Sequence, residues 1–174
     1  MEDKKDKIFK LIQDFLKTPP LIVWGSGATI PFGVPSMGTL NEKIKEEITE
    51  FDTNSENLEI ELGKEKYQDI LPEIKKVIWK EITKADLSVL NKIITNNTTE
   101  FKGVKAIFES FLSAHPQKID VVTTNYDRVL EYILSYNRIN FTDGFIGKAL
   151  SDFNESLFSD RNIVNIIKVH GSLS

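Results

Sequence analysis

The sequence predicts an α/β fold built around a parallel sheet. Three apolar stretches rich in β-branched residues have the length and composition of strands, namely residues 21–24 (LIVW), 119–123 (IDVVT) and 163–169 (IVNIIKV). Helical periodicity fills most of the chain between the first two. Strands separated by helices favour a parallel sheet, and ligands of such sheets bind at the carboxyl ends of the strands.

Composition restricts the class of protein. The 174 residues suit one domain with its own core, and a content of 40% hydrophobic and 28% charged residues is ordinary for a soluble globular protein. A net charge of −4 argues against a nucleic-acid partner. The absence of cysteine, with only His115 and His170 as histidines, argues against disulfides and a metal site. We see no signal peptide and no apolar run of the about 18 residues that a membrane helix needs, so we expect a cytoplasmic protein without a membrane partner.

The N-terminal segment predicts a helix and then a strand. Residues 7–17 carry apolar side chains at helical spacing, and Thr18-Pro19-Pro20 should stop this helix. We expect the helix to pack at the edge of the domain. Residues 21–24 follow as a short buried strand.

A glycine-rich turn follows the first strand. Gly25-Ser26-Gly27 lets the backbone approach a ligand closely, and phosphate is the usual guest because backbone N–H groups can point at it. The spacing departs from the dinucleotide-binding fingerprint, whose third glycine would stand at Ile30, whereas the next glycine is Gly33. A purely structural strand-turn is the alternative interpretation.

The next helix is expected close to this turn. Ser36 is a candidate N-cap for a helix from about Met37 to Phe51. Its N-terminus beside the glycine-rich turn would favour an anion. Residues 52–66 are polar and unperiodic, and we expect a loop or a weak helix there.

The middle of the chain is predicted to be all helical. Apolar periodicity predicts three further helices, at residues 70–82, 87–94 and 104–112. The polar run 95–100 ends the second of them, and His115-Pro116 ends the third. Such a stretch is too long for a plain crossover between strands. We therefore predict one domain of residues 1–174 with a helical insertion at about 52–115, and a surface position for His115.

The second and third strands also end in unusual turns. Residues 119–123 lead into Thr124-Asn125-Tyr126-Asp127 and then into a helix with apolar residues between 129 and 134. Residues 141–145 look like a turn. The third strand runs into His170-Gly171-Ser172. All three turns therefore lie at strand carboxyl ends, which predicts a single site at one edge of the sheet.

The side chains at these strand ends suit the cleavage of a sugar bond with a good leaving group. The Asn125 carboxamide can hold a ribose hydroxyl or orient water, and His170 can accept a proton near neutral pH. Ser26 lacks the pattern of a serine-triad nucleophile. Alternatives stay open for each residue: His170 buried in the core, Asn125 as a turn residue, and Asp127 as a helix cap.

The three turns together resemble the sirtuin superfamily. GSGATIPFGVPS resembles the family's Gly-Ala-Gly-x-Ser loop with its following Gly-x-Pro, TTNYD resembles Thr-Gln-Asn-x-Asp, and VHGS resembles the His-Gly motif. The pattern is most similar to the sirtuin-like domains of bacterial anti-phage defence proteins, which are NAD hydrolases. The resemblance implies a Rossmann-like fold and NAD as the substrate.

The resemblance also implies roles for individual residues. Asn125 and His170 would be the catalytic pair, and Asp127 matches the acidic position that contacts nicotinamide. Gly25, Gly27 and Thr29 would lie in the loop that contacts the NAD phosphates. The complete set of implied cofactor-binding residues is Gly25, Ser26, Gly27, Ala28, Thr29, Gly33, Pro35, Thr124, Asp127 and Gly171.

Two departures from the family pattern shape the expected activity. Ser36-Met37-Gly38 replaces the Asp-Phe-Arg that follows Pro35 in deacylases, and the four-cysteine zinc module is missing. Both favour hydrolysis of NAD to ADP-ribose and nicotinamide over deacylation. Members of the family continue with further strands after the His-Gly motif. We therefore expect this chain to be the N-terminal part of such a domain, with a sheet that is incomplete at the C-terminus.

The resemblance further implies a role in anti-phage defence, as a homo-oligomer or with a fused or partner defence domain. The main alternative is a non-catalytic module that binds NAD or ADP-ribose and regulates a partner. A protein deacylase or ADP-ribosyltransferase is a weaker one. The choices between NAD and NADP, and between hydrolysis and cyclisation, stay open at this point.

Overall fold

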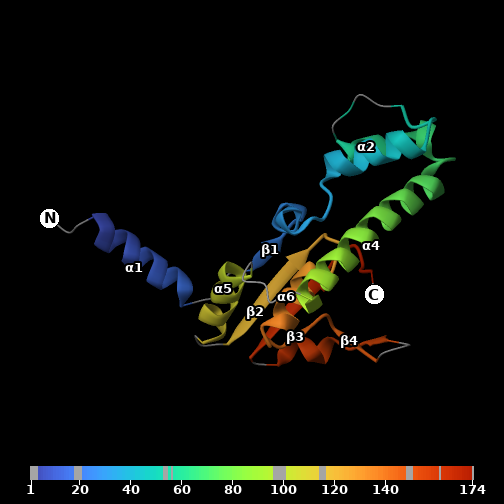
Figure 1. The fold of residues 1–174 in the computed structure, drawn as a ribbon. Coiled ribbons are helices and arrows are strands. Elements are labelled where there is room, and N and C mark those ends of the chain that lie inside the picture. Colours follow the sequence, from blue (N-terminus) through green and yellow to red (C-terminus); the bar gives the residue numbers. More distant parts are fainter. Residues whose placement is uncertain are drawn as a thin grey trace.

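A four-stranded parallel sheet forms the centre of the protein, and the sequence predicts its parallel arrangement and three of its strands. Its strands are β1 (Ile22–Trp24), β2 (Lys118–Thr123), β6 (Ile163–Lys168) and β3 (Phe141–Thr142), in the spatial order β1-β2-β6-β3. Every pairing between them is parallel. The mixed α/β architecture is consistent with a Rossmann-like fold (Figure 1).

The chain is seen here in a computed structural model. It describes residues 4–17, 21–52, 55, 57–95, 101–113, 117–147, 151–160 and 162–173. The helices are α1 (Lys4–Leu16), α2 (Met37–Glu47), α3 (Leu58–Leu62), α4 (Leu71–Thr95), α5 (Lys102–Leu112) and α6 (Val129–Tyr136). Short 3-10 helices are η1 (Ser26–Ala28), η2 (Ile30–Phe32), η3 (Glu65–Tyr67) and η4 (Glu155–Ser159), and a two-stranded antiparallel ribbon is formed by β4 (Phe145–Ile146) and β5 (Asp152–Phe153).

Helices α5 and α6 cover one face of the sheet. Side chains alternate between the two faces of a strand, and Ile119, Val121, Val164 and Ile166 are completely buried on the covered face. They pack with a cluster that includes Phe108 of α5 and residues of α6. The opposite face is more open, because Val23 is 77% exposed there.

A second core lies among the helices that project away from the sheet. Figure 1 shows α2 and the first half of α4 extending together beyond the carboxyl ends of the strands. Ile44 of α2 and Ile74 of α4 are fully buried against each other's helices, with Phe51 and Tyr67 in the same cluster. The Ser36 hydroxyl accepts a hydrogen bond from the Thr39 N–H, which confirms Ser36 as the N-cap of α2. The boundaries of a helical insertion at about 52–115 stay a prediction.

The prediction of two separate helices at residues 70–82 and 87–94 is wrong, because α4 is one continuous helix. No proline or glycine interrupts residues 83–86. Asp86 could have capped a new helix, but its carboxylate is buried and bonded to α6 instead. Asp86 therefore stays within the helix, and its buried carboxylate is satisfied by Arg128 and Tyr132.

Smaller boundaries also differ from the sequence predictions. Helix α2 ends at Glu47 rather than Phe51, although Ile48 and Phe51 remain buried in the core. The weak helix expected within residues 52–66 is α3. The expected turn at 141–145 contains strand β3 and the first residue of β4, so the sequence missed the fourth strand of the parallel sheet.

Two apolar segments near the N-terminus are exposed, against expectation. Helix α1 forms as predicted, but Ile8, Phe9, Leu11 and Phe15 remain more than half exposed, so the packing predicted for it is wrong. Strand β1 is not buried either, because it pairs with β2 alone at the edge of the described sheet. The helix stops expected at Thr18-Pro19-Pro20, 96–100 and His115-Pro116 lie outside the described residues.

None of the helices in the described ranges combines the length and the apolar character needed to cross a membrane.

Candidate functional site

The three unusual turns meet at one edge of the sheet. Trp24 of β1 is in register with Thr123 of β2, which is in register with Lys168 of β6. The next residue of each strand therefore starts its turn at the same level. The Val169 N–H donates to the Thr123 carbonyl at 3.1 Å and continues the pairing by one residue. This arrangement agrees with the single edge predicted from the sequence.

The glycine-rich turn is a pair of 3-10 helices. The Ala28 N–H donates to the Gly25 carbonyl at 3.0 Å, and the Thr29 N–H donates to the Ser26 carbonyl at 3.0 Å. The second helix, η2, ends at Gly33, whose φ of +101° is a conformation that residues with a Cβ rarely adopt. Pro35 follows, half-buried, just before α2.

Open space surrounds Gly25 and Gly27. A Cβ placed on either glycine would meet no atom within 4 Å, and neither residue has a positive φ. The fold itself therefore does not require glycine at these two positions. Glycines that neither the backbone conformation nor the packing demands are expected where another molecule must approach the backbone closely.

Thr29 joins the glycine-rich turn to the turn after β2. Its side chain is completely buried, and Oγ1 lies 3.0 Å from the Ser26 carbonyl. Asn125 donates from Nδ2 to Thr29 Oγ1 at 3.4 Å. The Thr29 hydroxyl also lies close enough to the Asp127 carboxyl to lower its pKa. The structure thus brings together three of the residues predicted for the site from two distant parts of the chain.

Asp127 combines a structural and an electrostatic role. Its carboxylate accepts from the Val129 N–H at 3.2 Å, but the N-cap residue of α6 is Arg128, so the alternative of Asp127 as the helix cap is wrong by one residue. Burial raises the pKa of Asp127, and the Val129 N–H, the Lys168 ammonium and the Thr29 hydroxyl oppose that rise. A carboxyl in this environment holds its proton more readily than an exposed aspartate does.

His170 lies at the surface of the same edge. Its side chain is exposed, so the alternative of a histidine buried in the core is wrong. The ring packs beside Tyr126, with 6.5 Å between the ring centroids. Gly171 has a φ of +92°, and the Leu173 N–H donates to the Tyr126 carbonyl at 3.2 Å. In the described part of the chain no hydrogen bond joins His170 to Asn125, and Thr124 is exposed beside them.

Lys168 is a site residue that sequence reasoning missed. Its ammonium donates to the Asp127 carbonyl at 2.6 Å and to the Ser172 hydroxyl at 3.3 Å, and it pairs with Glu131 of α6 at 2.7 Å. Burial raises the pKa of Glu131, and the charge of Lys168 opposes this. The one signal in the sequence was a lysine within the apolar strand IVNIIKV.

A second missed cluster fixes α4 to the start of α6. The carboxylate of Asp86, completely buried, accepts from the Arg128 N–H at 2.7 Å, from Arg128 Nη2 at 2.7 Å and from the Tyr132 hydroxyl at 2.6 Å. Burial, together with the bond to Asp86, raises the pKa of Tyr132. Because Arg128 follows Asp127 directly, this cluster holds the Asn125–Asp127 turn against α4.

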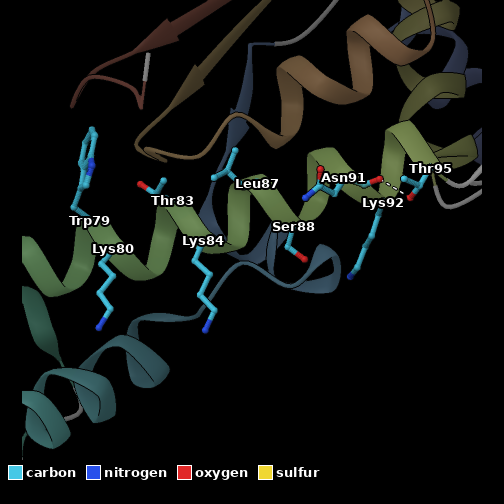
Figure 2. Close-up of a pocket in the computed structure, with 9 residues that line it drawn as sticks. All are labelled: Trp79, Lys80, Thr83, Lys84, Leu87, Ser88, Asn91, Lys92 and Thr95. Carbon is cyan, nitrogen blue, oxygen red and sulfur yellow. Dashed lines mark hydrogen bonds between the residues drawn. The ribbon is translucent and has the colours of Figure 1, made fainter.

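A groove of about 670 Å³ runs along α4. The groove is shallow and widely open to solvent. In Figure 2, Lys80, Lys84 and Lys92 extend to one side of the helix, and Trp79, Thr83 and Leu87 extend to the other. The groove is also tied to the glycine-rich turn, because a Cβ on Gly33 would lie 3.9 Å from Lys92 Nζ. The lining residues are Trp79, Lys80, Thr83, Lys84, Leu87, Ser88, Asn91, Lys92 and Thr95.

Comparison with known families now adds to the geometry. Residues 120–174 match the family model described as the SIR2-like domain. Residues 120–174 are therefore similar to a sirtuin-like domain. The match includes Asn125, Asp127, Lys168 and His170 but not the glycine-rich turn. The proposed place of that turn in the site rests on its geometry. No curated protein matches the chain.

A sirtuin-like domain indicates an NAD-related function in general, since SIR2-like domains bind NAD. No group of histidine, cysteine, aspartate and glutamate side chains within the described ranges could hold a metal ion.

Proposed function

We propose that the chain hydrolyses NAD at the bond between nicotinamide and ribose, giving ADP-ribose and nicotinamide. One observation carries the proposal: the open turn at Gly25 and Gly27 is joined through Thr29 to Asn125 and Asp127 in a chain with a sirtuin-like domain. This brings a place for phosphate beside a carboxamide and a carboxyl group that can act on a sugar.

The dinucleotide would bind with its diphosphate against the glycine-rich turn. Backbone N–H groups at Ser26 and Gly27 are not used as donors by the 3-10 turns, whose bonds start from Ala28 and Thr29. Lys92, beside Gly33, offers a positive charge to the same phosphates. The groove along α4 would take another part of the dinucleotide. Ala28, Pro35, Thr124 and Gly171 complete the proposed binding set.

The chemistry needs little covalent help from the protein. The ribose C1′–N bond breaks, its electron pair neutralises the cationic nicotinamide ring, and an oxocarbenium-like centre is left at C1′. Water adds to that carbon and gives up a proton. Asn125 would orient the water or a ribose hydroxyl, His170 would accept the proton, and Asp127 would contact the nicotinamide.

A second candidate function is a module that binds NAD or ADP-ribose without turnover. The exposed position of His170, beside Tyr126 rather than Asn125, favours this candidate. A general base must come within hydrogen-bonding reach of the proton that it takes, directly or through water. A deacylase is less favoured, because the residues after Pro35 and the lack of cysteine depart from that class.

The cellular role is a further part of the proposal. The sequence resemblance supports an effector of anti-phage defence that acts in the cytoplasm, as a homo-oligomer or with a fused or partner defence domain. The long helical stretch between β1 and β2 supports a helical insertion at about 52–115 beside the proposed NAD-binding edge.

Chromatography of NAD incubated with the protein tests the proposal. We expect nicotinamide and ADP-ribose in equal amounts, and cyclic ADP-ribose in their place would mean cyclisation. A parallel incubation with NADP decides which dinucleotide is preferred. A melting temperature that rises with NAD while no product forms would favour the binding module. The absence of both a temperature shift and a product would contradict the NAD assignment.

A further inference from the structure

We infer that Lys168 is a positioning residue that clamps the Asn125-bearing turn and the His170-bearing turn in one arrangement. This inference rests on the proposed function for its catalytic consequence, but the clamp itself can be tested without turnover. Lys168 is the last residue of β6, so it stands where its strand opens into the His170 turn.

The ammonium of Lys168 has three donors and three oxygen partners. These are the Asp127 carbonyl at 2.6 Å, a carboxylate oxygen of Glu131 at 2.7 Å and the Ser172 hydroxyl at 3.3 Å. The three partners come from three different segments: the turn after β2, helix α6 and the turn after β6. One group therefore fixes three segments, and all of its donor capacity is used in doing so.

The positions of these partners bring the clamp close to the predicted catalytic pair. Asp127 is two residues from Asn125, and Ser172 is two residues from His170. Two backbone hydrogen bonds join the same segments, from Val169 to Thr123 and from Leu173 to Tyr126. In the absence of Lys168, the His170 turn would depend on these two backbone hydrogen bonds, which lie at the surface.

Burial of the charged Lys168 side chain carries a cost in folding free energy. Its side chain is only 7% exposed and its one salt-bridge partner in the described residues, Glu131, is 16% exposed. A buried ion pair of this kind often stabilises a fold no better than apolar side chains of similar volume, although removal of one partner alone is strongly destabilising. An apolar pair could fill this space, but only an extended donor can reach the Asp127 carbonyl and the Ser172 hydroxyl together.

The test uses variants that separate the clamp from stability. Lys168→Met alone would leave the carboxyl of Glu131 buried without a partner, so the main variant is Lys168→Met with Glu131→Met, which removes both charges. Lys168→Arg keeps extended donors and should rescue function in part. Glu131→Gln keeps Lys168 and its bonds to both turns. Lys105→Met removes a lysine from an exposed pair with Glu109 on α5 and serves as the matched control.

We expect the double variant to keep a cooperative melt but to lose about 100-fold in kcat, the scale of loss that small misplacement of reacting groups causes. KM should change much less than kcat, because the phosphate-binding turn is untouched. Lys168→Arg should recover part of kcat, and Lys105→Met should behave as the parent protein. A folded double variant with unchanged kcat, or one that loses only affinity for NAD, would overturn the inference.

Amide hydrogen exchange provides the readout that does not need activity. In the double variant the amides of Val169 and Leu173 should exchange faster, while that of Ile166 in the middle of β6 should not. Unchanged exchange at Val169 and Leu173 would overturn the clamp whatever the kinetics. If the parent protein releases no nicotinamide but the exchange pattern changes as stated, the proposed function fails and the clamp stands.

Discussion

Asn125 donates from its side-chain amide to the hydroxyl of Thr29 at 3.4 Å, across a sequence separation of 96 residues. This contact joins the turn after β2 to the glycine-rich turn after β1. Because Thr29 is completely buried, is also bonded to Ser26 and lies close to the Asp127 carboxyl, the contact lies inside a network. The first turn can therefore be displaced only if the Asn125–Asp127 turn moves as well.

The space around Gly25 and Gly27 leads to the first prediction. Gly25→Ala and Gly27→Ala should leave the melting temperature nearly unchanged, because the new methyl groups meet no atom of the protein within 4 Å. Each should weaken NAD binding about 10-fold or more, since a methyl would occupy the place proposed for the diphosphate. Calorimetric titration with NAD measures the effect.

Two other glycines serve as controls for that experiment. Gly103→Ala on α5 also meets open space and should keep both stability and NAD affinity. Gly144→Ala should destabilise the fold, because its Cβ would lie 2.6 Å from a ring atom of Phe153 at a φ of +85°. Unchanged NAD affinity in both Gly25→Ala and Gly27→Ala would remove these glycines from the proposed site.

The buried carboxylate of Asp86 leads to the second prediction. Asp86→Ala removes the acceptor for both Arg128 and Tyr132 and should lower the free energy of unfolding by about 3 kcal/mol, the lower end for a broken buried pair, because Arg128 reaches solvent. Denaturant titration measures this loss. The substitution Lys43→Ala, in an exposed pair with Glu46 on α2, should change stability far less. Equal effects of the two substitutions would show that Asp86 contributes no more than a surface group.

The protonation of Asp127 leads to the third prediction. Burial raises its pKa above the ordinary value of 3.8, so the folded protein binds this proton up to a higher pH than the unfolded chain does. The stability from this group is therefore complete at low pH and is lost as the pH rises through the folded pKa. An amide in place of this carboxyl cannot titrate, so the Asp127→Asn variant should gain stability relative to the parent as the pH is raised from about 4 to about 7.

Melting curves of both proteins over that pH range provide the measurement. The groups that face Asp127 are the Val129 N–H, Thr29, Lys168 and Asp86, and the substitution leaves all of them in place. Glu131 also has a pKa raised by burial, but its contribution is present in both proteins and largely cancels. A stability difference that is independent of pH would contradict the raised pKa of Asp127.

The position of Lys92 leads to the fourth prediction. Lys92→Glu places a negative charge beside Gly33 and should weaken the binding of NAD about 10-fold, with a smaller effect at high salt where charges are screened. Lys84→Glu tests whether the groove along α4 contributes too. Titration at two salt concentrations measures both, and Lys75→Glu, an exposed position outside the groove, is the control. An affinity loss that is the same for all three variants would reflect net charge alone.

The sheet and its turns could be predicted because their signals are local. The runs IDVVT and IVNIIKV have the length and β-branched composition of buried strands, and Ser36 caps the helix that follows it within three residues. The convergence of the turns also followed from the sequence, because parallel strands share one carboxyl edge.

The missed residues depend on partners that are distant in the sequence. Asp86 looks like an ordinary polar position of a helix until Arg128 and Tyr132 surround it, and Lys168 looks like a flaw in an apolar strand until Asp127 and Ser172 approach. The exposure of β1 could not be predicted either. Apolar content indicates a strand, but the number of neighbouring strands decides whether it is buried.

The most direct test of the account is NAD breakdown by the parent protein, by Asn125→Ala and by His170→Ala, with melting curves for all three. We predict nicotinamide release by the parent and a loss of about 100-fold or more in both variants, the scale that positioned acid–base groups supply, with cooperative melts retained. Undiminished release by both folded variants would contradict the site at this edge of the sheet.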